Sequence, residues 1–549
     1  MKPILKFLMI LFSLAAFFDT KAQLLHEPHH FTHQDSLRGS ITPERAWWDA
    51  TWYGISVTPD FKNKTIQGKT DINFKVIEVG NLMQIDLQLP MEIQTVIWNN
   101  NKLTFKRDSN VYLVQFPRKL EKGSLQTIHI AYSGKPREAI HPPWDGGWIW
   151  RYDRQGNPWM SVACQGLGAS VWYPCKDHQS DEPDSASLTM IVPDTLNGIG
   201  NGRLRSMIKN NDATATYTWA VKNPINNYNI IPYIGKYVNW TETFDGEKGE
   251  LDCSYWVLTT SLDSAKEQFK QAPLMLKCFE HWFGPYPFYE DGYKLVESPH
   301  LGMEHQSAVG YGNRFRNGYL GRDLSETGWG LKWDFIIVHE SGHEWFGNNI
   351  TSKDLGDMWI HESFTNYSET IFTGCQYGKE AGNDYVIGTR KLIGNHSTII
   401  GPYNVNSEGD GGTDMYYKGG NMIHTIRNVI NDDELFRKIL RGLNETFYHQ
   451  TVTAKQIENY ISKQSGIDLS KVFDQYLRNP QLPVLEYKIT GSSLSYRWSN
   501  CVKGFNMPVK VSLDGEKWLK PTDQWQSIKT TATALRVDRN FYVLVREAT

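Results

Sequence analysis

One short stretch constrains the fold of this chain more than any other, the five residues His339-Glu340-Ser341-Gly342-His343. They lie in a window with apolar residues at three- and four-residue intervals, which predicts an α-helix. Residues four apart lie on one face of a helix, so both imidazoles can bind the same metal ion. Glu340 then lies beside that ion without having to bind it, where it can accept a proton from water.

A second predicted helix supplies a third metal ligand. Glu362 follows His343 after an 18-residue gap and opens the helical window in DMWIHESFTNYSE. A catalytic zinc usually has three protein ligands and one open position, whereas structural sites more often use Cys. The sequence therefore predicts one catalytic Zn²⁺ held by His339, His343 and Glu362. Gly342 costs about 1 kcal/mol in a helix relative to Ala, which predicts that another element packs closely there.

The hydrophobic pattern changes twice along the chain and divides it into three folded parts. A chain of 549 residues is long enough for several domains. Short runs of alternating apolar and polar residues predict an antiparallel β domain over 47–248. Helical windows then predict a mostly helical catalytic domain over 249–482. Strand-like sequence returns from Pro483, which predicts a small β module over 483–549. We expect a multidomain α+β protein.

The N-terminus has the pattern of a secretory signal peptide over residues 1–22. Lys2 and Lys6 precede an apolar run, Phe7 to Phe18, that is too short to span a bilayer comfortably. Small residues then stand at the two positions that signal peptidase inspects, so we expect cleavage after Ala22. An uncleaved membrane anchor is the alternative. No later stretch approaches the length of a membrane span. We therefore expect an exported protein, periplasmic or extracellular.

A polar arm, residues 23–46, follows the signal. Its His-rich run, His26 to His33, can bind metal adventitiously, but a solvated disordered tail is the favoured interpretation.

The six Cys are too few for a disulfide scaffold. Cys164 and Cys175 are the closest pair in sequence, but spacing alone does not give the pairing. Two Asn-x-Ser/Thr sequons, Asn349 and Asn366, flank the predicted metal site, where a glycan would obstruct folding or access. We expect both to be unglycosylated, which favours a bacterial source.

The metal-binding segment, HESGHEWFGNNIT followed by DMWIHESFTNYSE, resembles the gluzincin aminopeptidases, the family of aminopeptidase N and leukotriene hydrolase. Gly302-Met303-Glu304-His305 resembles their Gly-x-Met-Glu-Asn motif, and Tyr416-Tyr417-Lys418-Gly419 resembles their Tyr-x-Lys-Gly motif. The upstream WYPCKDHQSDEPDSASLTMIVP resembles a segment of their N-terminal β domain. The similarity extends from Trp47 to at least residue 440. The β module after residue 483 also resembles the small β-sandwich that these enzymes can carry.

The resemblance implies a thermolysin-like catalytic domain and further site residues. Tyr416 would donate its hydroxyl to the oxyanion that forms during hydrolysis. Glu304, in the motif with Gly302 and Met303, would bind the α-ammonium of the substrate and so select the end of a peptide. Gln165 aligns with a family glutamine near that amine.

Two residues depart from the family pattern. His305 stands where Asn is usual, and as a cation it would compete with the amine of the substrate. His361 stands before the ligand Glu362 where Asn is common. We expect His361 to be a helix-surface residue, although a partner of the metal ligands is the alternative. Neither change removes a ligand or the base.

These observations predict a zinc aminopeptidase that uses metal-activated water, with Glu340 as the general base. Its substrates would be peptides with a free N-terminal amine. A net charge of −3 gives no support for nucleic-acid or anionic-membrane binding. Other zinc hydrolases, either an endopeptidase or an enzyme with epoxide hydrolase activity, are alternatives, as is a catalytically inactive binding protein. Glu304 argues against an endopeptidase, and the intact ligands, base and Tyr416 argue against a binding protein. The oligomeric state is not predicted.

Overall fold

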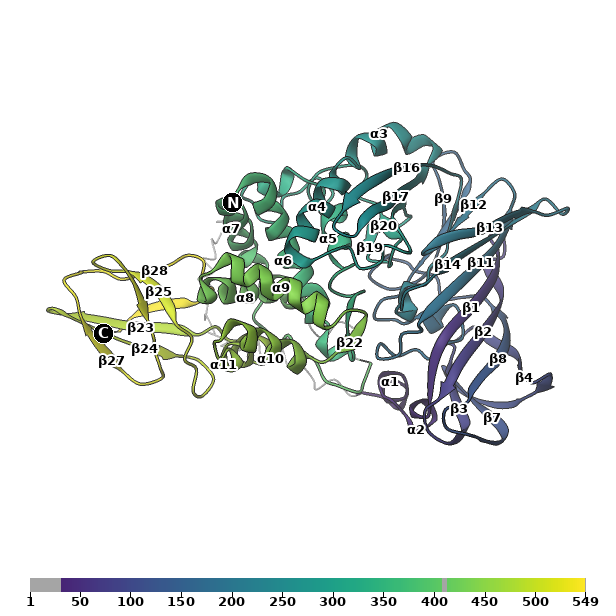
Figure 1. Cartoon of the computed structure of the whole chain (residues 1–549), viewed down its shortest axis with the longest axis horizontal. Coiled ribbons are helices and arrows are strands. Elements are labelled where there is room, and N and C mark those ends of the chain that lie inside the picture. Colours follow the sequence, from purple (N-terminus) through teal and green to yellow (C-terminus); the bar gives the residue numbers. More distant parts are fainter. Residues whose placement is uncertain (1–30, 407–411, 549) are drawn as a thin grey trace, which may run out of the picture.

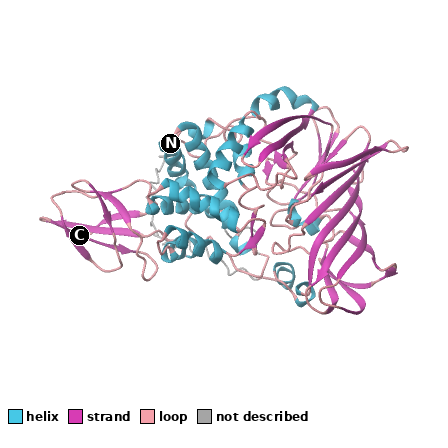
Figure 2. Cartoon of the chain, viewed as in Figure 1, coloured by secondary structure: helices cyan, strands magenta, loops and turns pink. Residues whose placement is uncertain are grey.

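The computed structural model describes residues 31–406 and 412–548. A β-rich part, a helical part and a smaller β part follow one another along the chain (Figures 1 and 2). The chain is thus a multidomain α+β protein with an N-terminal β-rich domain, as predicted. The predicted signal peptide and most of the His-rich run lie outside the described residues. The later part of the polar arm forms two short helices, α1 (His33–Gly39) and α2 (Pro43–Ala46).

An eight-stranded sheet forms most of the N-terminal part. In spatial order its strands are β13 (Arg203–Lys209), β14 (Thr214–Val221), β11 (Ser185–Pro193), β1 (Trp48–Asp60), β2 (Thr65–Val76), β8 (Leu125–Gly134), β4 (Glu92–Trp98) and β5 (Asn101–Lys102). Buried and more exposed residues alternate along β11 and β14, because one face of the sheet packs on the core.

The prediction of an antiparallel β domain fails at one strand pair. Strand β11 pairs in parallel with β1, with Trp52 opposite Ser185. A parallel pair needs a long connection, and here the whole segment between Phe61 and Asp184 supplies it. Two smaller sheets come largely from this segment. They are β3 (Gly80–Asp86), β7 (Val111–Leu120) and β6 (Thr104–Asp108), and β12 (Asn197–Ile199), β15 (Tyr233–Gly235), β10 (Pro158–Ala163) and β9 (Gly147–Tyr152).

The helical part begins with a five-stranded sheet. Its order is β16 (Tyr237–Gly246), β17 (Gly249–Leu258), β18 (Tyr293–Glu297), β20 (Val309–Tyr311) and β19 (Gly302–Met303). The domain boundary predicted at residue 248 falls in the turn between β16 and β17, and it stays a prediction.

The principal helices follow that hairpin. They are α3 (Leu262–Gln268), α4 (Gln271–Phe283), α5 (Phe335–Gly342), α6 (Trp359–Tyr377), α7 (Lys379–Gly388), α8 (Asp414–Ile430), α9 (Asp433–Thr446), α10 (Ala454–Ser465) and α11 (Ser470–Arg478). A two-stranded parallel sheet, β21 (Ile350–Ser352) with β22 (Gln450–Val452), packs beside α6. Among the described residues, no helix combines the length and apolarity needed to cross a membrane.

The C-terminal part contains two small sheets. One has the order β27 (Gln526–Lys529), β24 (Ser493–Ser499), β23 (Val484–Thr490) and β29 (Leu544–Glu547), and the other β26 (Glu516–Leu519), β25 (Val509–Ser512) and β28 (Arg536–Val537). Their buried residues join the core of the helical part, while the N-terminal part has a core of its own. Tyr476 of α11 donates its hydroxyl to the carbonyl of Tyr542 at 2.6 Å, which ties the last part to the helices.

Candidate metal centre and active site

Helix α5 carries the first metal-ligand candidates and is buried along its whole length. Asp334 precedes it and accepts hydrogen bonds from the backbone N–H groups of Ile336 and Ile337, so the carboxylate caps the helix N-terminus. His339 lies in the helix, and His343 is the residue at which it ends.

Helix α6 packs closely against α5. A Cβ atom placed on Gly342 would lie 2.5 Å from Ser368 Oγ and 3.2 Å from Thr365 Cγ2. The prediction that another element packs closely at this glycine is therefore confirmed. A disulfide between Cys278 and Cys375 joins α4 to the last turn of α6, whereas Cys164 and Cys175 are unpaired and buried.

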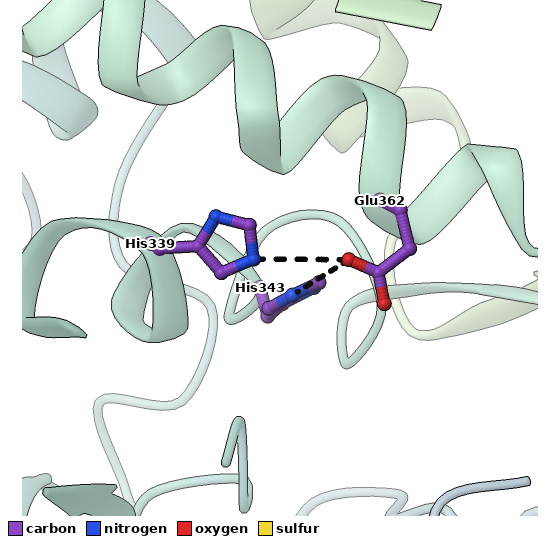
Figure 3. Close-up of side chains that lie close together, drawn as sticks. All are labelled: His339, His343 and Glu362. Atoms are coloured by element: carbon purple, nitrogen blue, oxygen red, sulfur yellow. Dashed lines mark ion pairs between the residues drawn. The ribbon is translucent and has the colours of Figure 1, made fainter. Parts of the chain in front are cut away.

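The three predicted ligands converge on one point (Figure 3). Glu362 Oε2 lies 3.7 Å from His339 Nε2 and 3.5 Å from His343 Nε2. Ligand atoms about 2.0–2.1 Å from a tetrahedral zinc lie about 3.3–3.4 Å apart, close to these separations. Within the described chain Glu362 Oε2 accepts no hydrogen bond although it is buried. The donor set and this unsatisfied oxygen therefore fit a Zn²⁺ ion.

Hydrogen bonds at Nδ1 fix the orientation of the imidazoles of His339 and His343. Nδ1 of His339 lies 2.7 Å from Glu369 Oε1, and Nδ1 of His343 lies 3.0 Å from the carbonyl of Phe346. Each Nδ1 donates there, so Nε2 is the nitrogen that points toward Glu362 and that can bind a metal ion once its proton is released. Glu369 in turn accepts a hydrogen bond from Tyr385 at 2.6 Å. Sequence reasoning missed Glu369, although it stands seven residues after Glu362 and so on the same face of α6.

The charges of this cluster suit cation binding. Burial alone would raise the pKa of Glu362, but the neighbouring His343 and His339 hold it well below its usual range. The carboxylate is thus ionised. Burial alone would lower the pKa of His339, but Glu362 and Glu369 raise the pKa of its imidazole well above the usual value.

The predicted base, Glu340, is buried beside the ligands. Burial raises its pKa to about 7, against the opposing effect of His339 and His343. Strand β19 lies directly against it, and a Cβ on Gly302 would come 2.5 Å from Glu340 Oε1. Gly302 therefore leaves space for this carboxylate.

Glu304 lies in the same pocket. Its carboxylate, that of Glu340 and His343 each place an atom within 4.8 Å of the others. Glu304 is only 2% exposed and accepts a hydrogen bond from the hydroxyl of Tyr228 at 3.0 Å. Burial raises the pKa of Glu304. Tyr228, from a 3₁₀ turn of the N-terminal part, was not predicted, because no local pattern indicates that it reaches β19.

Both departures from the family pattern lie in buried surroundings. His305 Nδ1 lies 2.5 Å from the hydroxyl of Tyr233, and burial, reinforced by His300, lowers the pKa of His305 well below its usual value. The expectation of a cation beside the substrate amine is therefore wrong. His361 is fully buried, accepts the backbone N–H of Ser352 at 2.9 Å, and has a pKa lowered by burial to about 3. It is not a helix-surface residue, because β21 covers that side of α6.

All the predicted site residues line one cleft of about 660 Å³. They are His339, Glu340, His343, Glu362, Gln165, Gly302, Met303, Glu304 and Tyr416. The N-terminal part contributes Gln165 and the exposed Trp144, and the helical part supplies most of the rest, so the cleft lies between these two parts. Burial raises the pKa of Tyr416 well above its usual value, which keeps its hydroxyl protonated and able to donate.

Comparison with known proteins agrees with this geometry. Residues 274–476 match the Peptidase family M1 domain. Aminopeptidase N of Lactococcus lactis subsp. lactis is 28% identical over 231 residues, which are 38% of this chain and 27% of that protein. Probable aminopeptidase 2 of Sulfurisphaera tokodaii is 21% identical over 499 residues, 85% of this chain and 59% of that protein. The chain thus spans less than two thirds of the length of these two relatives.

A solved structure shares the fold. The M1 zinc metallopeptidase from Deinococcus radiodurans superposes with a TM-score of 0.67 at 19% identity, over 79% of this chain and 94% of that one. The family match over residues 274–476, the curated relatives and the arrangement of the three predicted ligands together support a zinc metallopeptidase. The chain thus carries a match to the peptidase family M1 domain and is similar to the gluzincin aminopeptidases.

Proposed function

We propose that this protein is a zinc aminopeptidase that removes the first residue from peptides with a free N-terminal amine. The observation that carries the proposal is the buried carboxylate of Glu304 beside His343 and Glu340. A carboxylate in this position pairs with an α-ammonium group only when the scissile bond is the first in the chain. The distance between the Glu304 carboxylate and the metal-ligand cluster thus limits cleavage to a single N-terminal residue.

The residues divide the chemistry among them. Zn²⁺ bound by His339, His343 and Glu362 would act as a Lewis acid and lower the pKa of water toward about 7. Glu340 accepts the proton of the attacking water and later returns it to the leaving amine. Burial raises the pKa of Glu340 above its usual value, which helps the carboxyl group to hold the proton between the two steps. Tyr416 donates its hydroxyl to the developing oxyanion, a contribution of about 2.7–4 kcal/mol for donors of this kind.

Glu304 and Gln165 hold the substrate amine from two parts of the chain. Glu304 receives the ammonium as an ion pair, with Tyr228 fixing one carboxylate oxygen. Gln165 lines the cleft from the N-terminal part, where its amide can orient the same end of the substrate. Met303 and Trp144 line the cleft as apolar surface nearby.

A panel of aminoacyl-arylamides, assayed with and without a chelator, tests the proposal. We expect release of the arylamine that is lost on chelation and regained when Zn²⁺ is added back. Lack of turnover by a zinc-loaded sample across the panel would contradict an aminopeptidase.

We also propose that the protein is exported and that cleavage follows Ala22. The disulfide between Cys278 and Cys375 supports an oxidising compartment. Sequencing the N-terminus of mature protein from a bacterial host tests this. Gln23 as the first residue supports the proposal, and recovery of intact Met1 in a reducing compartment contradicts it.

We further propose that residues 483–549 form a small β-sandwich domain. The two sheets of this region share a buried set that includes Trp498, Met507 and Val511. A high-resolution experimental structure in which the two sheets do not face each other would contradict it.

A further inference from the structure

The later part of the polar arm, residues 33–46, contacts both the N-terminal β-rich part and the helical part of the molecule (Figure 1). On one side Arg45 donates to Asp86 at 2.6 Å, and Gln34 donates to Asp108 at 3.1 Å, both in the N-terminal β-rich part. On the other side the backbone N–H of Asn406, in the helical part, donates to the carbonyl of Asp35 at 3.0 Å. This arm precedes the residues that match the family domain.

One side chain of the arm reaches the loop that carries Gln165. Arg38 donates a hydrogen bond from Nη2 to the carbonyl of Gly166, and its Nε lies 3.7 Å from Asp177 Oδ2. Both charged side chains are largely buried, with exposures of 14% and 9%. Asp177 also accepts from the backbone N–H and the hydroxyl of Ser170, at 3.2 and 2.5 Å. The ion pair thus holds the loop of residues 164–170 at Gly166 and at Ser170.

The loop is shaped around this ion pair. Gly168 has a φ of +95°, which other residues rarely adopt, and a Cβ there would collide with both Asp177 Oδ2 and Arg38 Nη2. The glycine therefore allows the guanidinium and the carboxylate to pass beside the backbone.

Gln165 and Gly166 are the residues of this loop that line the cleft. The residue after Gln165 is Gly166, which has a φ of +72°. Its carbonyl oxygen accepts the hydrogen bond from Arg38. Nε2 of Gln165 is buried and makes no hydrogen bond to any residue that the structure describes. Because no hydrogen bond to Nε2 fixes the side chain of Gln165, the orientation of its amide depends on the conformation of the backbone at residues 165 and 166.

We propose that Arg38 is a positioning residue for substrate binding: it fixes the 164–170 loop so that Gln165 faces the substrate amine. This inference rests on the proposed aminopeptidase function. It extends the amine-binding site to an arm that lies outside the family domain and touches no substrate itself.

The test uses two inhibitors that differ only in the amine. Leucine hydroxamate and 4-methylpentanoyl hydroxamate carry the same zinc-binding group and side chain, and only the first has an α-amine. Their inhibition constants are measured on zinc-loaded full-length protein for the wild type, Arg38→Ala, Gln165→Ala and the double variant. Gln34→Ala is the matched control, because it removes an arm contact on the same helix that does not touch the 164–170 loop.

We expect Arg38→Ala to weaken the amine-bearing inhibitor about fivefold or more and the amine-free one less than twofold. In the Gln165→Ala background the same substitution should cost less than twofold, because coupled residues are not additive. Gln34→Ala should bind both inhibitors as the wild type does. Where Arg38→Ala lowers the melting temperature strongly, Arg38→Lys provides the measurement, since lysine cannot span both Gly166 and Asp177.

Equal weakening of both inhibitors, or an undiminished effect in the Gln165→Ala background, would overturn the inference and leave Arg38 a general structural residue. Unchanged binding in a folded Arg38→Ala variant would overturn it as well. Failure of the wild type to cleave any aminoacyl-arylamide would instead overturn the proposed function, and this inference with it.

Discussion

Replacing Glu369 by Ala should weaken zinc binding although Glu369 touches no metal. Glu369 is fully buried, and its carboxylate holds His339 Nδ1 at 2.7 Å, Tyr385 Oη at 2.6 Å and Asn366 Nδ2 at 3.1 Å. Without it, the imidazole of His339 can rotate, and its Nδ1–H loses its acceptor in a buried place.

The size of the effect follows from these contacts. Partners of metal-ligating histidines are typically worth about 10–100-fold in metal affinity, or about 1.4–2.7 kcal/mol. Three donors depend on this one carboxylate, so we expect the upper half of that range, about 30–100-fold. Glu369→Gln keeps an oxygen for His339 and should lose less than about tenfold. Tyr385→Phe removes only the contact to the other oxygen and should change the affinity by less than about threefold.

Competition with a chromophoric chelator measures the zinc dissociation constant of each variant, and circular dichroism confirms that each is folded. The order expected is wild type, Tyr385→Phe, Glu369→Gln, Glu369→Ala, from tightest to weakest. Wild-type zinc affinity in a folded Glu369→Ala variant would refute the inference that Glu369 orients His339.

Three other outcomes are expected. Glu340→Gln should keep its zinc while kcat falls by several orders of magnitude, since base and acid roles are each worth about 10²–10⁴; metal analysis that shows zinc lost in step with activity would make Glu340 a ligand instead. Gly302→Ala should lower kcat more than zinc content, because the added Cβ would lie 2.5 Å from Glu340 Oε1; wild-type kinetics would show that strand β19 can move away. Removing zinc with a chelator should lower the thermal unfolding midpoint of the helical part. The loss corresponds to about 4 kcal/mol of stability if zinc had been present at 1,000 times its dissociation constant. An unchanged midpoint by calorimetry would mean that zinc does not bind the folded state.

The sequence was sufficient to predict that His339, His343 and Glu362 come together and that a β-rich part precedes a helical part. Spacing on a helix brings His339 and His343 to one face whatever the rest of the protein does, and the helix that begins near Glu362 supplies the third ligand. Glu304 and Tyr416 were predicted only by resemblance, because they come from elements far from α5 in sequence.

Burial and long-range pairing account for what could not be predicted. The expectations for His305 and His361 failed because a single sequence does not reveal that Tyr233 or β21 packs against these rings. Tyr228 contacts Glu304, and Arg38 contacts the loop that bears Gln165, only through tertiary structure. The parallel pairing of β1 with β11 depends on a connection of more than a hundred residues, which no local pattern encodes.

A time course on one decapeptide, with a free or an acetylated N-terminus, tests the aminopeptidase function most directly. If Glu304 pairs with the α-ammonium, acetylation leaves a buried carboxylate unmatched, which costs about 3–5 kcal/mol, or upwards of a hundredfold. Mass spectrometry should then show successive single-residue losses from the free peptide alone, and Glu304→Ala should slow that ladder by a similar factor. Internal fragments from both forms, cut at similar rates, would show that Glu304 does not select the chain end and that the enzyme is an endopeptidase.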